Sequence, residues 1–182
     1  MLTPIVYYNM MSLPIKQKQD PVLRELTKPV PIQDLPTSWL DKLLNEMSLT
    51  LAECSDGVAL AAPQIGELWR VFIVGKRAFP KRDTSKPWPG DLVFINPVII
   101  RQSRRKTELT EGCLSVLNCY GTTKRHERVS VVAYDQRGQK LIRHASGLLA
   151  QVFQHEIDHL NGILFTDHAR DLHDVEPGLN HD

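Results

Sequence analysis

A pair of closely spaced histidines in the C-terminal third of the chain is the feature best suited to chemistry. The sequence there reads His155-Glu156-Ile157-Asp158-His159. Two histidines four residues apart on a helix project from the same face, so both imidazoles can bind one divalent cation. The intervening glutamate points to a neighbouring sector, where a carboxylate can take a proton from bound water without being a ligand. The segment therefore predicts a metal site with its own general base.

The helix that would carry this pair is indicated by its ends and by its apolar positions. Ser146 is a candidate N-cap, and Asn161-Gly162 is a candidate C-terminal stop. Leu148 and Val152 precede the histidines at helical spacing, which places all four side chains on one stripe. Two buried imidazoles without partners would cost on the order of several kcal/mol, so a metal explains the pair better than two core histidines.

A catalytic site of this type needs a third protein ligand and an open position for water. Cys113, in the segment Glu-Gly-Cys-Leu-Ser, is the best candidate, because a thiolate binds borderline and soft cations well. Gly112 would let the chain turn tightly beside the ion. Spacing alone fits an ordinary buried thiol equally well.

Three segments taken together resemble the signature motifs of one enzyme family. Residues 57–64 read Gly-Val-Ala-Leu-Ala-Ala-Pro-Gln, residues 111–115 read Glu-Gly-Cys-Leu-Ser, and residues 154–162 read Gln-His-Glu-Ile-Asp-His-Leu-Asn-Gly. In this order they resemble the three motifs of the peptide deformylases. The likeness covers residues 15–167, which is most of the chain.

The resemblance implies a metal-dependent hydrolase that removes the N-formyl group from the N-terminal methionine of newly synthesised polypeptides and releases formate. It implies one ion per chain, Fe(II) in the first place and Zn(II), Ni(II) or Co(II) as alternatives. The implied metal ligands are Cys113, His155 and His159.

The resemblance also implies roles for three further residues in catalysis. Metal-bound hydroxide would attack the formyl carbon, with Glu156 as the general base. The side-chain amide of Gln64 and the backbone N–H of Leu114 would stabilise the developing oxyanion.

By the same resemblance, the substrate would bind as an added strand against the segments around residues 58–60 and 115–120, with a pocket for the methionine side chain. Glu111 would support the metal ligands, and Arg125 and Asp158 would brace the helix against the strand after the cysteine motif. The residues expected around the substrate are Gly57, Val58, Ala59, Leu60, Leu109, Glu111, Leu114, Leu148 and Val152.

Two positions depart from the family pattern. Ala59 stands where the family usually has glycine, and Leu117 stands where it usually has proline. A methyl group at residue 59 would disfavour a positive φ and is expected to lie where the substrate backbone passes. Reduced activity or an altered substrate is the consequence to test.

Apolar periodicity predicts the surrounding elements. An amphipathic helix is expected from Pro36-Thr37 to about Cys54, with strands at residues 71–74, 92–95, 129–134 and 139–143. Residues 79–90 are expected to form a surface loop, and residues 135–138 a turn. Past Phe165 the polar chain is expected to fray. We predict a single α+β domain over residues 1–182, with antiparallel strands packed around a central metal-binding helix and with residues 1–12 and 168–182 flexible.

Composition limits the partners and the compartment. The 182 residues carry a net charge of +1, which gives no field to recruit DNA. Three cysteines, one of them assigned to metal, argue against disulfides and for a reducing compartment, the bacterial-type cytoplasm or an organelle. No apolar run reaches the roughly 18 residues that span a bilayer. The basic run at residues 101–106 is expected to be a solvated turn, with the ribosome surface as an alternative partner.

Two rival functions stay open at this point. A metallopeptidase would share the His-Glu-x-x-His pattern, with His168 or His173 in place of Cys113 as the third ligand. A non-catalytic descendant would keep the metal for structure, a reading to which Ala59 alone points. Glu156 and Gln64 argue against that descendant, because a purely structural site needs neither of them.

Overall fold

The computed structural model describes residues 11–79 and 90–175. Most of the loop expected at residues 79–90 therefore lies outside the described residues, as does most of the expected N-terminal extension. Besides five short 3-10 helices, the elements in chain order are α1 (Ser38–Glu53), β1 (Ala59–Ala61), β2 (Val71–Val74), β3 (Leu92–Gln102), β4 (Lys106–Cys113), β5 (Val116–His126), β6 (Arg128–Tyr134), β7 (Lys140–Ser146), α2 (Leu148–Leu160) and β8 (Arg170–Asp174). The α+β class is confirmed.

Helix α1 confirms the amphipathic helix that the sequence predicts. The Thr37 hydroxyl caps it by accepting a hydrogen bond from the Leu40 backbone N–H at 3.3 Å. The helix ends at Glu53, with Cys54 as its C-cap. Its buried face consists of Leu40, Leu43, Leu44, Met47, Thr50 and Leu51.

Five antiparallel strands form the larger sheet, in the order β1-β2-β3-β6-β7. Strand β3 runs well beyond the predicted end at residue 95, although Pro97 cannot donate to the ladder. A register shift between Ile95 and Val98 accommodates that proline. Asn96, at φ +51°, lies in this shift and its side-chain amide makes two 2.8 Å hydrogen bonds with the Val30 backbone.

The smaller sheet contains β4, β5 and β8 in that order, and β8 contradicts the expectation of a frayed tail after Phe165. Backbone pairing holds β8 in place, with Cys119 opposite Asp174 and Tyr120 opposite His173. All five residues of β8 have exposed side chains. The strand therefore has no apolar alternation by which its sequence could have been recognised.

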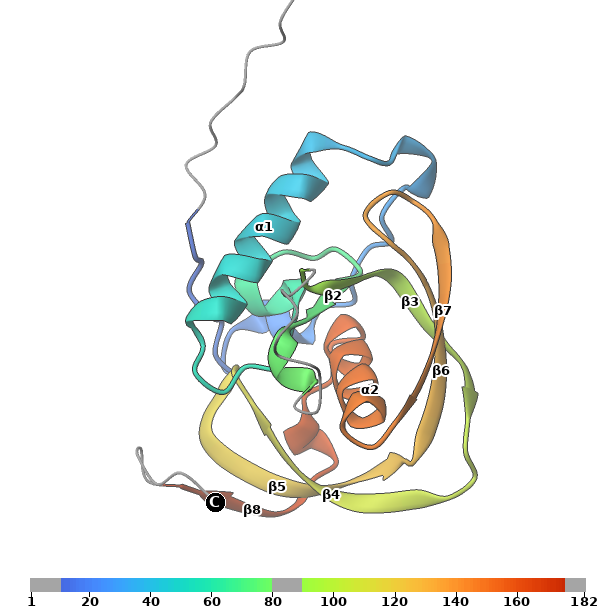
Figure 1. Ribbon diagram of the computed structural model, residues 1–182. Coiled ribbons are helices and arrows are strands. Elements are labelled where there is room, and N and C mark those ends of the chain that lie inside the picture. Colours follow the sequence, from blue (N-terminus) through green and yellow to red (C-terminus); the bar gives the residue numbers. More distant parts are fainter. Residues whose placement is uncertain (1–10, 80–89, 176–182) are drawn as a thin grey trace, which may run out of the picture.

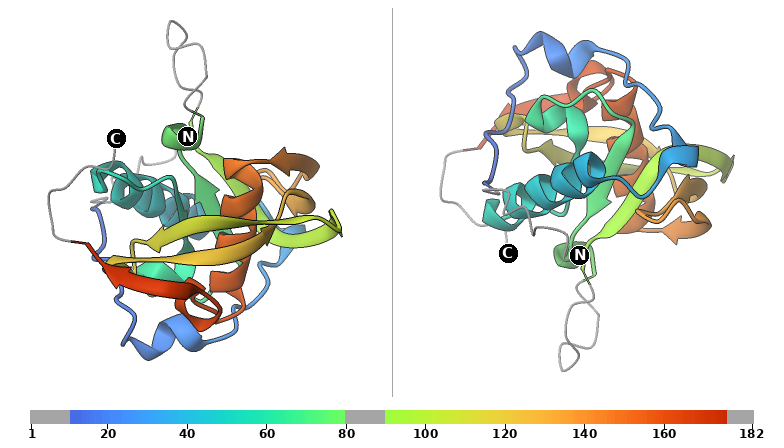
Figure 2. Two further views of the ribbon diagram at one scale, coloured as in Figure 1. Left: turned by 90° about the horizontal axis from the view of Figure 1, so that it is seen from below. Right: turned by 90° about the horizontal axis from the view of Figure 1, so that it is seen from above.

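Helix α2 lies between the two sheets (Figure 1). In the view from below the three-stranded sheet lies in front of α2, and in the view from above α1 lies in front of the larger sheet (Figure 2). One core cluster joins α2 to the inner face of the larger sheet, where the Phe94 ring lies 4.6 Å from Phe72 and 4.8 Å from Phe153 between centroids. A second cluster joins α1 to the opposite side of β1 and β2.

The ends of α2 are set by backbone geometry. Its N-cap is Gly147 rather than Ser146, because Ser146 is still paired with Arg128 as the last residue of β7. The predicted stop at Asn161-Gly162 is confirmed. Gly162 has φ +73°, and a Cβ there would lie 2.6 Å from the carbonyl oxygen of Arg24, so a side chain would be strained and would clash.

Candidate active site

The three expected metal ligands come together between β4 and α2. The Sγ of Cys113, at the end of β4, lies 3.2 Å from Nε2 of His159, and the His155 and His159 ring centroids are 4.9 Å apart. One donor atom from each of the three residues lies within 4.8 Å of the others. Among the described residues this is the only such cluster of three or more donors, and neither His168 nor His173 belongs to it.

The donor set fits a divalent transition metal. Burial alone would raise the pKa of the Cys113 thiol, but the neighbouring histidines hold it well below its usual value, which favours the thiolate. A thiolate and two imidazoles suit ions of borderline softness and leave a tetrahedral site with one open position. The three residues therefore fit the expected ion.

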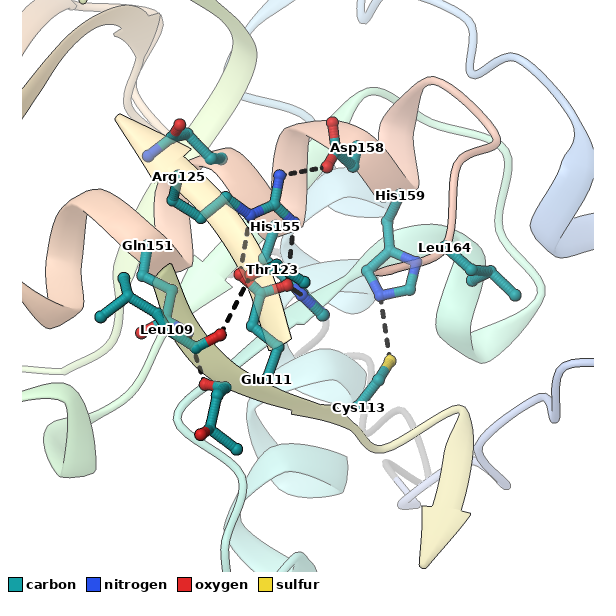
Figure 3. Close-up of polar contacts among 12 residues, drawn as sticks. Leu109, Glu111, Cys113, Thr123, Arg125, Gln151, His155, Asp158, His159 and Leu164 are labelled. Atoms are coloured by element: carbon teal, nitrogen blue, oxygen red, sulfur yellow. Dashed lines mark hydrogen bonds and ion pairs between the residues drawn. The ribbon is translucent and has the colours of Figure 1, made fainter. Parts of the chain in front are cut away.

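A carboxylate and a guanidinium stand behind the ligands. Nδ1 of His155 lies 3.2 Å from Oε2 of Glu111, and Arg125 donates to both Glu111 oxygens at 2.7 and 2.9 Å. Arg125 Nη1 also donates to Asp158 Oδ2 at 2.6 Å (Figure 3). Burial favours a raised pKa for Glu111, but the hydrogen bonds from Arg125 and His155 hold that pKa well below its usual value.

This network fixes the ring of one ligand. A carboxylate that accepts from Nδ1 selects the tautomer whose Nε2 is free for a metal. Because Arg125 spans from β5 to Asp158 on α2, it also ties the helix to the strand. The predicted contact between Arg125 and Asp158 is present, and Glu111 lies behind His155 as expected.

Glu156 is buried beside the ligands without a partner for one of its oxygens. Its side chain is 4% exposed, and Oε2 makes no hydrogen bond to any described residue. Burial, opposed in part by the two histidines, raises the pKa of Glu156 to about 7. A carboxyl group in that range can both accept and release a proton near neutral pH.

Gln64 presents its side-chain amide to the same site. Its Oε1 accepts from the Ala61 backbone N–H at 2.9 Å, which fixes the orientation of the amide. Nε2 then points toward the cysteine loop, where it donates to Ser115 Oγ at 3.2 Å and lies 3.6 Å from Cys113 Sγ. The amide of Gln64 is thus a preset donor beside the metal ligands.

A cavity of about 520 Å³ opens onto these groups. Of the residues expected at the substrate or in catalysis, those lining it are Gly57, Val58, Ala59, Gln64, Glu111, Leu114, Leu148, Val152 and Glu156. Cys113 and His155 line it as well, and Leu117 stands at its mouth, 65% exposed.

Two expected substrate contacts are not brought to the cavity. Leu60 is fully buried on the α1 side of β1, because alternate residues of a strand point to opposite faces. Leu109 lies four residues along β4 from Cys113, a distance of about 13 Å in an extended strand, and the cavity lining does not include it.

Ala59 has a different setting from the one its sequence position suggests. It lies in β1 with extended backbone, so no positive φ is required of it. Its methyl group belongs to the core cluster that includes Phe72 and Phe153, and the residue is 5% exposed. The methyl therefore points to the face of the sheet and not along the edge where a peptide backbone would pass.

Gly112 is needed for close approach and not for a tight turn. The residue is not among those with positive φ, and a Cβ there would lie 2.6 Å from a ring carbon of Tyr120 on the paired strand. The expectation that its freedom lets the chain turn beside an ion is therefore wrong.

Sequence reasoning missed three glutamines that hold the site together. Gln17 donates to the Leu114 carbonyl at 3.2 Å and thereby anchors the loop after Cys113. Gln151 lines the cavity and donates to the Thr110 carbonyl at 2.8 Å. Gln154 binds both the N–H and the carbonyl of His126. Gln154 begins the third motif and Gln151 lies one helical turn before His155, whereas Gln17 carries no such signal.

The chain matches one protein family over most of its length. The sequence model of the family described as polypeptide deformylase matches residues 12–175. The peptide deformylase of Mesorhizobium japonicum is 40% identical over 153 residues, which are 84% of this chain and 81% of that protein. The peptide deformylase of Heliobacterium modesticaldum is 44% identical over 150 residues, or 81% of this chain and 87% of that protein.

A solved structure agrees with these relatives. A class I type b peptide deformylase from Acinetobacter baumannii, crystallised with Met-Ala-Ser bound, is 35% identical and superposes with a TM-score of 0.77, covering 87% of this chain and 99% of that one. The matched family, the identity of the relatives and the shared fold agree, and the chain belongs to the peptide deformylase family.

Proposed function

We propose that this chain removes the N-formyl group from the N-terminal methionine of newly made polypeptides, with Cys113, His155 and His159 holding one metal ion and Glu156 acting as the base. The observation that carries the assignment of roles is the buried carboxylate of Glu156, whose Oε2 has no partner among the described residues. Burying a carboxylate without a partner costs free energy. Its position beside three metal ligands therefore indicates that it accepts and releases a proton during the reaction.

The residues divide the reaction between them. An ion held by Cys113, His155 and His159 would supply Lewis acidity and lower the pKa of water. Glu156 accepts the proton of the attacking water at Oε2 and returns it to the departing amine. Gln64 Nε2 and the backbone N–H of Leu114 donate to the oxyanion that develops from the formyl oxygen.

Main-chain pairing along β1 would hold the peptide. Strand β1 is the edge of its sheet, and just before it the Val58 carbonyl accepts from the N–H of Gly75, the residue that follows β2. In an antiparallel pair, hydrogen-bonded positions alternate, so the N–H and carbonyl of Ala59 face the free edge beside the cavity. A substrate strand can bind there whatever its side chains, which suits an enzyme that acts on many new chains.

A methionine at the substrate N-terminus fits the apolar part of the cavity. Val58, Leu148 and Val152 line it near the helix that carries the histidines. The Acinetobacter baumannii structure holds Met-Ala-Ser, a peptide that begins with methionine. Leu117 at the mouth is placed to touch residues that follow the methionine.

We assign Fe(II) as the native ion, with Zn(II), Ni(II) and Co(II) as substitutes, because one soft thiolate and two imidazoles accept all four. Metal analysis of protein purified without oxygen would test the assignment. Cys54, Cys113 and Cys119 form no disulfide, which supports a reducing compartment such as the cytoplasm, where fractionation should find the protein. Within the described residues, the structure contains no helix long and apolar enough to cross a membrane.

The test of the proposed function is formate release from formyl-Met-Ala by anaerobically purified, iron-loaded protein. Glu156→Gln keeps the size of the side chain and removes the base. Turnover should fall by about 10²- to 10⁴-fold while metal content stays at one ion per chain. Absence of formate release from fully loaded wild-type protein would contradict the function, and a Glu156→Gln variant with normal turnover would contradict the role of Glu156.

A metallopeptidase is disfavoured by the donor cluster. It would need a histidine or glutamate as the third ligand, whereas within the described residues Cys113 takes that place. Cys113→Ser should therefore lower metal retention sharply. Normal retention in this variant would return His168 and His173 to consideration.

The ribosome is the partner we propose beyond the substrate. Residues 101–106 include the turn from β3 to β4, and their four basic side chains are exposed. Cosedimentation with ribosomes should weaken when Arg104, Arg105 and Lys106 are replaced by glutamine, while formate release from a free peptide should not change. Unaltered cosedimentation would exclude this turn as the contact.

A further inference from the structure

A second cavity lies where β3 and β7 end and β6 begins. Its volume is about 520 Å³, and it is open to solvent. Its lining comes from β3, β6 and β7 and from the turn after β3, and consists of Arg101, Gln102, Ser103, Arg128, Val129, Ser130, His144, Ala145 and Ser146.

The strand register explains why polar groups gather there. Ser130 on β6 lies directly opposite both Arg101 on β3 and His144 on β7, and Arg128 lies opposite Ser146. Opposed residues of neighbouring strands point to the same face, and residues two apart on a strand do so as well. Val129, which lies between Arg128 and Ser130, and Val131 point to the opposite face and pack against α2 in the core. By this register the basic and hydroxyl side chains share the face of the sheet opposite to Val129 and Val131.

Among the described residues, none forms an ion pair with the positive charges of the cavity. The lining contains two guanidinium groups and no carboxylate. Over residues 11–79 and 90–175, neither Arg101 nor Arg128 forms an ion pair. The acidic residue next in sequence, Glu127, is engaged elsewhere, since its Oε1 accepts from Arg105 at 2.9 Å and from Thr107 at 2.7 Å.

The hydroxyl and imidazole groups add neutral donors in fixed positions. Ser130 Oγ lies 2.8 Å from Nδ1 of His144. When the hydroxyl donates to Nδ1, the proton of the imidazole sits on Nε2, which has no partner among the described residues and can donate to a ligand. The Ser103 hydroxyl donates to the Arg105 carbonyl and accepts from the Arg128 N–H, so its proton is not available to a ligand.

We propose that this cavity binds a phosphate group. Guanidinium groups match the geometry of phosphate oxygens with paired donors, and hydroxyl and imidazole N–H groups complete the coordination of such an ion. A carboxylate lining would repel the ligand, and none is present. The phosphate can belong to a small nucleotide or to the backbone of an RNA strand. The site is separate from the metal site, because no residue lines both cavities.

The test uses the full-length, metal-loaded enzyme and two probes, adenosine monophosphate and a short fluorescein-labelled single-stranded RNA. Binding is measured by calorimetry for the nucleotide and by anisotropy for the RNA, in low salt. The variant Arg101→Gln/Arg128→Gln removes both guanidinium groups. Its matched control, Arg137→Gln/Arg143→Gln, removes the same charge from the β6–β7 hairpin at positions that do not line the cavity.

The cavity variant should lose about tenfold or more in affinity, and the control less than about twofold. Saturable binding of the nucleotide with one site per chain would identify a small ligand. RNA binding that the nucleotide displaces only weakly would identify the polymer backbone. Equal losses in the two variants would overturn the proposal in favour of general charge attraction. Failure of both probes to bind wild-type protein would overturn it as well. Formate release should be the same in all variants, so deformylation is tested separately.

Discussion

Arg125 Nη1 donates to Asp158 Oδ2 at 2.6 Å, and this contact joins β5 to the helix that carries two metal ligands. The same guanidinium donates twice to Glu111, which in turn contacts Nδ1 of His155. The charge on Asp158 is therefore linked to the orientation of a ligand through two intermediate side chains.

Replacement of Asp158 by lysine should weaken metal binding. The like charge would push Arg125 away from α2 and loosen its hold on Glu111, and loss of such supporting contacts typically costs about 10- to 100-fold in metal affinity. Competition with a chromophoric chelator measures the change. Glu108→Lys is the control, because Glu108 pairs with Arg170 on the surface of the smaller sheet. Equal retention in wild type and Asp158→Lys would contradict the link.

Gln64→Leu should lower kcat by roughly 100-fold with little change in KM, because a donor to a developing oxyanion acts mainly in the transition state. Steady-state kinetics on formyl-Met-Ala gives both constants. Ser115→Ala is the matched variant, since it removes the group that accepts from Gln64 Nε2 but keeps the amide itself. If Ser115→Ala lost as much activity as Gln64→Leu, the effect would be structural and not that of a donor.

Ala59→Gly should leave kcat/KM on formyl-methionyl peptides within about twofold of wild type, because the Ala59 methyl packs in the core and does not face the free edge of β1. The same change should destabilise the fold by about 0.5–1 kcal/mol, since glycine in a strand costs backbone entropy and packing. Urea unfolding measures the second effect. A gain in kcat/KM of tenfold or more would mean that the methyl obstructs the substrate.

The ion pair between Arg24 and Asp167 should make stability depend on pH. The hydrogen bonds from Arg24, together with the Leu164 N–H, outweigh partial burial and hold the pKa of Asp167 below its usual value. A carboxylate with a depressed pKa stabilises the fold above its unfolded pKa, and this contribution is lost as the pH falls through the folded pKa.

Arg24→Gln should therefore lower the Tm slightly at neutral pH and make no difference at strongly acidic pH. The pair is half exposed, so the effect corresponds to about 1 kcal/mol or less. Asp167→Asn is the companion variant, because its amide oxygen can still accept from the Leu164 N–H. A difference that persisted unchanged into strong acid would show that the charge of Asp167 is not its source.

The local sequence determined several of the elements and part of the chemistry. The period of the apolar residues indicated α1, β2 and β6, and a spacing of four put His155 and His159 on one face of α2. These features depend on neighbours along the chain, so the rules of periodicity and capping can predict them. The resemblance of three motifs added Cys113 and Gln64, whose places no local rule could give.

The tertiary structure decided what depends on contacts between distant segments. Strand β8 forms because its backbone pairs with β5, although its side chains carry no apolar alternation. The face to which a strand residue points separated Leu60 from the cavity and placed the Ala59 methyl in the core against α2. Gln17 and Gln154 support the site through side-chain contacts with backbone groups far away in sequence. The basic cavity arises in the same way, because strand register alone sets Arg101, Ser130 and His144 side by side.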